Sequence, residues 1–196
     1  MDMNNLFLKH NEWAISDGKN GEKLEIEHAE MSGIEMRGLN LSCSLIVESN
    51  LNRAILTNND MSDGYFLSTS FDGADLSDSL ISKAVFDFAS LKEAVLKNSI
   101  AIKASFEEAD LSSADLFAAD LRRASFRKAN LSHANFAAAD LSGAILDGAL
   151  LCGTDFKAAR GLDEVSANYV IIGTAAEPVR LEGEAVHQWL LEQGRG

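Results

Sequence analysis

A large apolar residue recurs at every fifth position along most of this chain. Residues 109–144 read ADLSSADLFAADLRRASFRKANLSHANFAAADLSGA, and we call the large apolar residue of each unit its centre. The same phase runs from Ile26 to Phe156, where 26 of 27 centres are Ile, Leu, Met or Phe and only Ala101 is small. A period of five fits neither an α-helix (3.6) nor a strand (2). The chain therefore needs a fold whose own repeat is five residues long.

The remaining positions of each unit indicate which side chains point inward. The residue two before each centre is uncharged throughout and is most often Ala. All 31 charges between residues 24 and 158 fall on the other three positions. Two positions in five are therefore expected to face inward and three outward. A solenoid with short, flat sides satisfies this pattern, because each unit stacks on a unit of the next coil.

The units resemble those of the pentapeptide repeat family, whose pattern is Ala-(Asp/Asn)-Leu-X-X. The resemblance covers about 135 of the 196 residues. It implies an all-β solenoid, a right-handed quadrilateral parallel β-helix with four units, hence 20 residues, in each coil. Residues 24–158 would make about seven coils, and the unbroken phase predicts that no loop is inserted between them.

The two ends lack the repeat and are predicted to be caps. Residues 1–23 form the N-terminal cap, with a short helix over 5–15. Residues 159–196 form the C-terminal cap, with a strand over 169–172, a second strand near 179–181 and a helix over 184–192. That last helix places Val186, Trp189 and Leu190 on one face. In similar proteins such a segment caps the rod and joins two copies, so a cap and a homodimer both remain open.

Bulk composition excludes several classes of function. The net charge is −13, which argues against direct nucleic-acid binding and permits partners with basic surfaces. No apolar stretch approaches the roughly 18 residues of a membrane span, and the first residues lack the pattern of a signal peptide. Cys43 and Cys152 do not make a disulfide framework, and both occupy outward positions of the repeat. We expect a cytoplasmic protein that does not bind membranes.

Motifs that carry catalysis are missing from the sequence. There is no glycine-rich phosphate loop, nucleophile elbow or His-Glu-x-x-His pair. The four histidines are scattered, and the many aspartates before the centres follow the repeat, so they read as repeat residues rather than acid–base pairs. The sequence therefore predicts no catalytic residue, no metal site and no cofactor, and we expect that the protein is not an enzyme.

The departures from the repeat gather on one side of the expected rod. If residues 20 apart stack, the side with centres from 26 to 146 has a net charge of −5 from its outward residues. We call it the acidic side, and its charged residues are Glu25, Glu27, Glu48, Asp87, Glu107, Glu108, Asp147, Arg127 and Lys128. Apolar residues replace the usual Asp or Asn in one column, Leu45, Tyr65 and Val85, and form a second column at Val47 and Leu67, with Phe88 beside them.

Two interpretations of these apolar columns follow. An exposed apolar patch rimmed by charge is a candidate binding site for a protein partner. Alternatively, outward residues of this kind only stabilise the stacking of neighbouring coils, as cross-strand pairs do in any sheet.

Two functions of different classes are consistent with the sequence. The first is a non-enzymatic interaction module, a rigid acidic rod that binds an unidentified protein. The second comes from the resemblance, since some members of the family mimic B-form DNA and protect type II topoisomerases such as DNA gyrase from quinolones or peptide toxins. B-DNA carries one charge per about 1.7 Å. Residues 24–158 carry a net −9 over an expected rod of roughly 33 Å at strand spacing, which is less than half that density.

Overall fold

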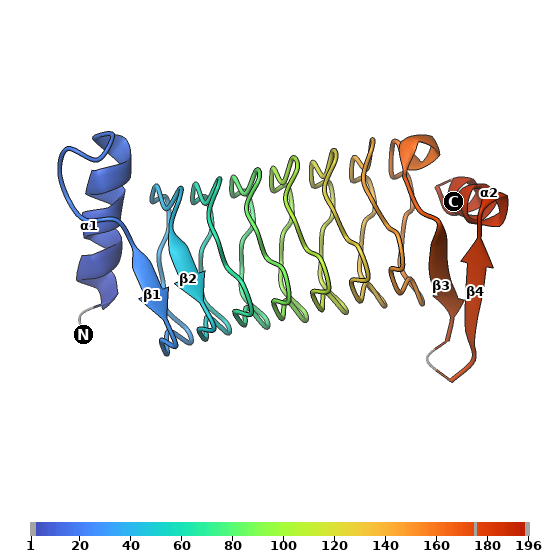
Figure 1. Cartoon of the computed structure of the whole chain (residues 1–196), viewed down its shortest axis with the longest axis horizontal. Helices are drawn as coiled ribbons and strands as arrows, with labels where there is room; N and C mark the ends of the chain where they lie inside the picture. The colour runs from blue at the N-terminus through green and yellow to red at the C-terminus, as the bar shows by residue number, and fades with distance from the viewer. Residues whose placement is uncertain (1–2, 175, 195–196) are drawn as a thin grey trace.

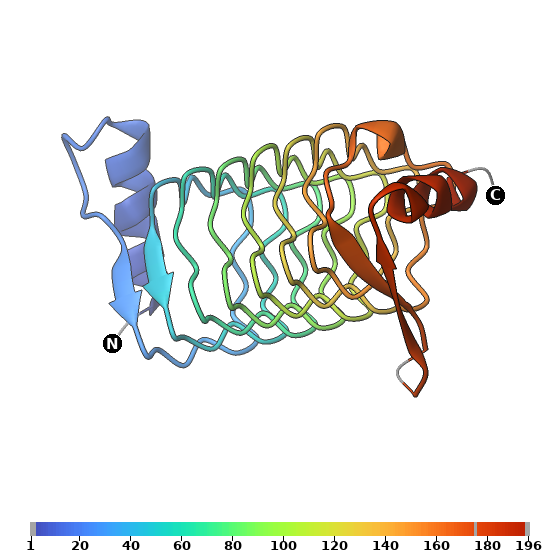
Figure 2. The same cartoon turned by 45° about the vertical axis from the view of Figure 1, so that its right-hand side comes forward.

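The computed structural model describes residues 3–174 and 176–194, and these form a long rod of stacked coils (Figure 1). Helix α1 (Met3–Ile15) lies at one end, followed by strand β1 (Glu25–Glu27) and strand β2 (Leu45–Val47) in the first coils. A 3₁₀ helix, η1 (Leu162–Glu164), precedes the hairpin of β3 (Tyr169–Gly173) and β4 (Pro178–Glu182). The last element is helix α2 (Glu184–Gln193), which lies across the other end of the rod (Figure 2).

Neighbouring coils are joined by parallel backbone bridges between residues 20 positions apart. Leu45 pairs with Tyr65 and Tyr65 with Val85, and the same offset holds up to the bridge between Asp140 and Arg160. This is the offset expected for four five-residue units in each coil. Within the described coils, strands of three residues form only at β1 and β2. Each remaining side of a coil contributes a single bridged residue. Strand content is low because a turn interrupts the extended backbone in every unit.

Each turn places one residue in the left-handed region of the backbone. Every fifth residue from His28 to Ala158 has a φ between 47° and 74°. In most units a hydrogen bond closes the turn from the N–H three residues after the centre to the carbonyl of the centre, as from Ala74 to Phe71 at 2.9 Å. This is the arrangement of a type II turn, which requires a positive φ at its third residue. Most of these residues are not glycine, so the sequence accepts a local cost at its corners.

The centres fill the interior of the rod. Beyond the first coil their side chains are at most 2% exposed, whereas Ile26 in the first coil is 8% exposed. Phe66, Phe86, Phe106 and Phe126 stack face to face through four coils, with ring centroids 4.9, 5.3 and 5.1 Å apart. The buried alanines two residues before the centres let the backbone close around these rings.

Helix α1 covers the first coil and begins two residues earlier than residues 5–15, where the sequence predicted a helix. Its Phe7 side chain is buried. The Asn11 side chain accepts the N–H of Asn40 at 2.8 Å, and His10 contacts the carbonyl of Ser42 at 3.0 Å. The helix thus replaces, on one side of the rod, the hydrogen bonds that a preceding coil would have made.

The backbone ladder continues past the last repeat with one residue added. Ile145 pairs with Ser166 and Leu150 with Ile171, an offset of 21 residues instead of 20. Gly161, with a φ of 71°, and η1 absorb the extra residue. Strand β3 therefore stacks directly on the final coil, and β4 pairs with it in antiparallel fashion. Within the described ranges, no helix is long and apolar enough to span a membrane.

Candidate protein-binding side

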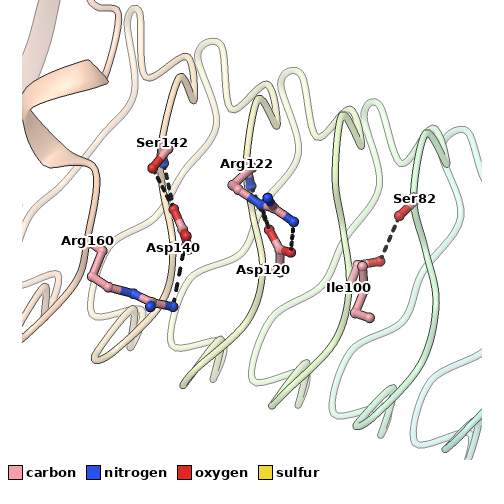
Figure 3. Close-up of polar contacts among 7 residues, drawn as sticks. All are labelled: Ser82, Ile100, Asp120, Arg122, Asp140, Ser142 and Arg160. Atoms are coloured by element: carbon pink, nitrogen blue, oxygen red, sulfur yellow. Dashed lines mark hydrogen bonds and ion pairs between the residues drawn. The ribbon is translucent and has the colours of Figure 1, made fainter.

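The aspartates and asparagines before the centres have a structural role. The Asp140 side chain accepts the backbone N–H of Ser142 at 3.1 Å and its hydroxyl at 2.7 Å, and Asp120 holds Arg122 in the same way (Figure 3). A side chain that bonds the backbone two residues on fixes the local turn. Among residues 3–174 and 176–194 no cluster of three or more His, Cys, Asp or Glu could hold a metal ion.

The first apolar column is continuous at the level of the backbone. Leu45, Tyr65 and Val85 are bridged in series, and Glu25 pairs with Leu45 below them. Leu45 and Val85 are half-buried, whereas 51% of Tyr65 is exposed. The two aliphatic side chains therefore flank the tyrosine along the rod and leave its ring accessible to another molecule.

The second column adds half-buried aliphatic surface beside the first. Val47 and Leu67 lie on successive coils, where the N–H of Glu48 donates to the carbonyl of Leu67 at 3.0 Å. Phe88 lies one coil further along and is 57% exposed. The structure therefore places all six sequence-predicted residues on one side of the rod, with Tyr65 and Phe88 as its most accessible members.

Phe88 also has an unusual backbone. It occupies the left-handed corner of its turn with a φ of 60°. A bulky side chain is rare in this region, because its Cβ approaches the following carbonyl. The other corners from 28 to 158 carry polar, charged or small residues. A large aromatic residue at a corner thus has a conformational cost that is offset by burial of less than half of its surface, and such a cost is typical of functional positions.

Charge on the acidic side is distributed unevenly along the rod. In its C-terminal half Arg127 lies 3.4 Å from Asp147, and Lys128 lies 2.8 Å from Glu108. The hydrogen bond to Glu108 raises the pKa of Lys128, and the backbone N–H of Asn168 lowers the pKa of Asp147. These acids are therefore largely neutralised within the chain itself.

The N-terminal half keeps more of its negative charge. Glu48 faces His28 at 3.2 Å, and Glu25 faces Lys23 at 3.2 Å, while Glu27 has no ion pair with a described residue. The apolar columns lie in this half. The combination is a set of accessible aromatic rings next to carboxylates, which suits a partner with basic residues around an apolar contact.

The C-terminal residues singled out from the sequence pack inward. Val186 and Leu190 are fully buried. Trp189 is half-buried and meets the ring of Phe156 edge to face, with centroids 6.3 Å apart. Their contacts are with the end of their own rod. The accessible apolar residues of this region are Val179, at 49% exposed, and Leu191, at 39%.

One expectation about the cysteines is wrong. Cys43 is exposed as predicted, but Cys152 is buried at 3% exposure. Its position is outward in the repeat, yet it lies in the final coil, where Leu151 donates to the carbonyl of Ile171 at 2.7 Å. Strand β3 stacks on this coil and covers an outward position that solvent would otherwise reach.

Some exposed apolar residues on other sides were not among the binding residues predicted from the sequence. Leu80, Ile100 and Phe117 are 41%, 38% and 44% exposed. They too replace the polar residues that usually occupy outward positions, so the same signal would have found them. Lys103 and Arg123 border a hollow of about 490 Å³, and neither has an ion pair among the described residues.

Comparisons with known proteins agree with this architecture. The model of the family described as pentapeptide repeats matches residues 89–116 and 118–158, in eight copies. Residues 89–116 and 118–158 of this chain are pentapeptide repeats. Its earlier coils keep the bridges and the corner conformations although their sequence has departed from the repeat. Among curated proteins, no sequence shows significant similarity to the chain.

Several solved structures resemble the rod. One is HetL, a pentapeptide repeat protein involved in heterocyst differentiation regulation from the cyanobacterium Nostoc sp. strain PCC 7120. It is 23% identical over 78% of this chain and 79% of that chain, with a TM-score of 0.39. A pentapeptide repeat protein from the thylakoid lumen of Arabidopsis thaliana is 34% identical, over 45% of this chain and 61% of that chain, with a TM-score of 0.32.

A third solved structure is QnrB1, a plasmid-mediated fluoroquinolone resistance protein. It is 15% identical over 86% of this chain and 98% of that chain, with a TM-score of 0.41. At these levels of similarity the roles of the three proteins do not transfer to this chain.

Proposed function

We propose that this chain is a non-enzymatic interaction module, a rigid right-handed four-sided β-helix of about seven coils that binds a protein partner on its acidic side. The observation that carries the proposal is the exposure of Tyr65 and Phe88, at 51% and 57%, among stacked apolar residues on a charged side. Residues 1–23 and 159–196 act in this proposal as the caps of the rod.

The rod suits binding because its surface is already ordered. Tyr65 stands between bridged neighbours on both adjoining coils, so little backbone freedom is lost when a partner docks. Preorganised surfaces bind with a smaller entropic cost than mobile ones. Tyrosine is also among the residues that contribute most to binding energy at protein interfaces.

Charge narrows the chemistry of the partner. Glu25, Glu27 and Glu48 lie along the N-terminal half of the acidic side, and the whole chain has a net charge of −13. A partner with basic residues around an apolar contact would be steered toward this side and would match it once bound.

Mimicry of DNA toward a type II topoisomerase is the alternative function. Negative charge favours it, but Arg127 and Lys128 lie within the acidic side and pair with Asp147 and Glu108. A DNA mimic needs a continuous band of uncompensated charge. DNA mimicry therefore ranks below the binding of a protein partner through the exposed apolar residues.

The test uses substitutions on exposed side chains that leave the interior unchanged. In the variants Tyr65→Ser/Leu67→Ser and Phe88→Ser, we expect capture of the partner from the host lysate to fall at least tenfold. Phe117→Ser is the matched control, because it removes an aromatic ring of similar exposure from another side. Equal capture by all the variants, with unchanged circular dichroism, would show that the partner binds elsewhere.

A second experiment separates the two functions. Purified chain is added to a gyrase supercoiling assay with and without a quinolone. The interaction proposal expects no change in either condition, and protection or inhibition that survives Tyr65→Ser/Leu67→Ser would favour DNA mimicry instead.

A homodimer through the C-terminal segment remains part of the proposal. Because Val186 and Leu190 are buried in the chain itself, a dimer would use Val179 and Leu191. Light scattering of the chain and of Val179→Ser/Leu191→Ser tests this, since only a dimer built on these residues would dissociate.

A further inference from the structure

The outer edge of β1 is an open end of the backbone ladder. In the interior, three hydrogen bonds join each coil to the next on this side. Between the second and third coils they run from Tyr65 to the carbonyl of Ser44 (2.9 Å), from Ile46 to that of Tyr65 (2.8 Å) and from Glu48 to that of Leu67 (3.0 Å). On the first coil, the groups equivalent to those of Tyr65 and Leu67 are the N–H and carbonyl of Glu25 and the carbonyl of Glu27. Within the described residues these three groups have no partner.

Helix α1 completes the ladder on another side and leaves this one free. His10 and Asn11 contact the carbonyl of Ser42 and the N–H of Asn40, which are edge groups of the first coil. Between α1 and β1 lies a groove of about 320 Å³, lined by Leu6 and residues 22–27. The two elements stand next to each other at the end of the rod (Figure 1). An extended segment would lie in this groove in the position of a missing coil.

The floor and rim of the groove indicate the side chains of its occupant. Ile26 is 8% exposed, against 2% for Ile46 and 0% for Phe66 in the next two coils, and the half-buried Leu6 lies beside it. An apolar residue at the centre of an added strand would cover both. Glu25 and Glu27 flank Ile26 on the outward positions and are exposed. Basic residues on either side of the apolar one would face these carboxylates, as opposite charges do in cross-strand pairs.

We propose that β1 accepts a strand from a partner protein, an extended segment with an apolar residue between two basic residues, added in parallel to Glu25–Glu27. The segment would form the three hydrogen bonds that interior coils form and would complete the core above Ile26. Recognition of this kind takes its affinity from the main chain and its specificity from alternate side chains. Pairing with β1 of a second copy of this chain is disfavoured, because its Glu25 and Glu27 would meet identical carboxylates.

The proposed site is separate from Tyr65 and Phe88, so the two proposals can fail independently. The probe is the synthetic peptide acetyl-Thr-Ala-Lys-Leu-Lys-Gly-Thr-amide, labelled with a fluorophore for anisotropy. Two further peptides serve as comparisons, one with Pro in place of Leu, which lacks the N–H that would donate to Glu25, and one with Glu in place of both Lys.

We expect the Lys-Leu-Lys peptide to bind and each comparison peptide to bind at least tenfold more weakly. Glu25→Lys/Glu27→Lys is expected to lose at least tenfold in affinity. Asp78→Lys/Glu93→Lys changes the net charge equally at exposed corners of other coils and should bind normally, which separates the site from general attraction to an acidic rod. Tyr65→Ser/Leu67→Ser should also bind normally.

Hydrogen exchange gives a readout that charge alone would not move. The N–H of Glu25 should exchange rapidly in the free chain and at least tenfold more slowly with the Lys-Leu-Lys peptide bound. No binding at millimolar peptide, equal binding of the Pro peptide, or protection that maps away from residues 25–27 would each overturn the proposal.

Discussion

The imidazole of His10 joins helix α1 to two separate stretches of the first coil. Its Nδ1 accepts the backbone N–H of Leu24 at 2.9 Å, and its Nε2 lies 3.0 Å from the carbonyl oxygen of Ser42, to which it donates as the neutral tautomer. The ring is fully buried and stacks on Trp13. Only the neutral form satisfies both contacts, because a protonated Nδ1 cannot accept from Leu24.

Docking of α1 is therefore expected to weaken in mild acid. Burial lowers the pKa of His10 below its ordinary 6.5, and the hydrogen bond to Ser42 opposes this only in part. The unfolded state binds the proton first, so the contribution of His10 is complete above about pH 6.5 and is lost as the pH falls toward the folded-state pKa. The free energy of unfolding by denaturant, followed by Trp13 fluorescence between pH 7.5 and 5, measures this loss of stability.

A non-titrating variant isolates this effect. His10→Gln should show a flatter dependence on pH than the wild-type chain and a loss of about 1–3 kcal/mol at pH 7.5, the cost of a poorly satisfied buried group. His28→Gln, at an exposed position, should keep the wild-type dependence. If His10→Gln retains the full slope, another group is responsible.

The corner at Phe88 should be more stable without its aromatic ring. Asparagine tolerates the left-handed region better than phenylalanine, so Phe88→Asn is expected to stabilise the rod by about 1 kcal/mol, which raises Tm by roughly 2–4 °C in a chain of this size. Ala138→Asn, at a corner with a φ of 59°, should do the same. Partner capture should fall only with Phe88→Asn, and equal capture would remove Phe88 from the binding side.

The stacked rings should dominate the stability of the interior. Phe106 lies between Phe86 and Phe126 and is fully buried, so Phe106→Ala is expected to cost about 3–5 kcal/mol. Phe117→Ala removes an exposed ring and should change stability by less than about 0.5 kcal/mol. Thermal unfolding followed by circular dichroism compares them, and similar Tm values would contradict a core organised around this stack.

Gly161 is expected to be much less replaceable than Gly33, although both have positive φ. A Cβ on Gly161 would overlap the side chain and backbone of Ser142, whereas a Cβ on Gly33 would meet nothing within 4 Å. Gly33→Ala should cost only the conformational term of about 1 kcal/mol. In Gly161→Ala the steric overlap should lower the free energy of unfolding by about a further 1–3 kcal/mol, because it falls where the backbone ladder takes its extra residue. Equal losses in denaturant unfolding would mean that the chain relaxes freely there.

The periodic sequence predicted the inward and outward positions of most of the rod, including the stacking of Leu45, Tyr65 and Val85. It could do so because each unit repeats the same local geometry, so one sequence offset becomes one spatial relationship. The helices and strands of the two ends were also predicted, from apolar periodicity and the placement of glycine and proline. The local signal was sufficient wherever neighbouring residues alone decide the conformation.

Contacts between distant segments decided the rest. The burial of Cys152 depends on β3, the packing of Trp189 depends on Phe156, and the role of His10 depends on Leu24 and Ser42. None of these pairs is related by the five-residue period, so the sequence by itself determined the coil and the local elements of the ends, and left the packing of those ends undetermined. At each end the repeat stops and backbone groups and apolar rings lose their next coil, and only tertiary packing could decide what replaces it.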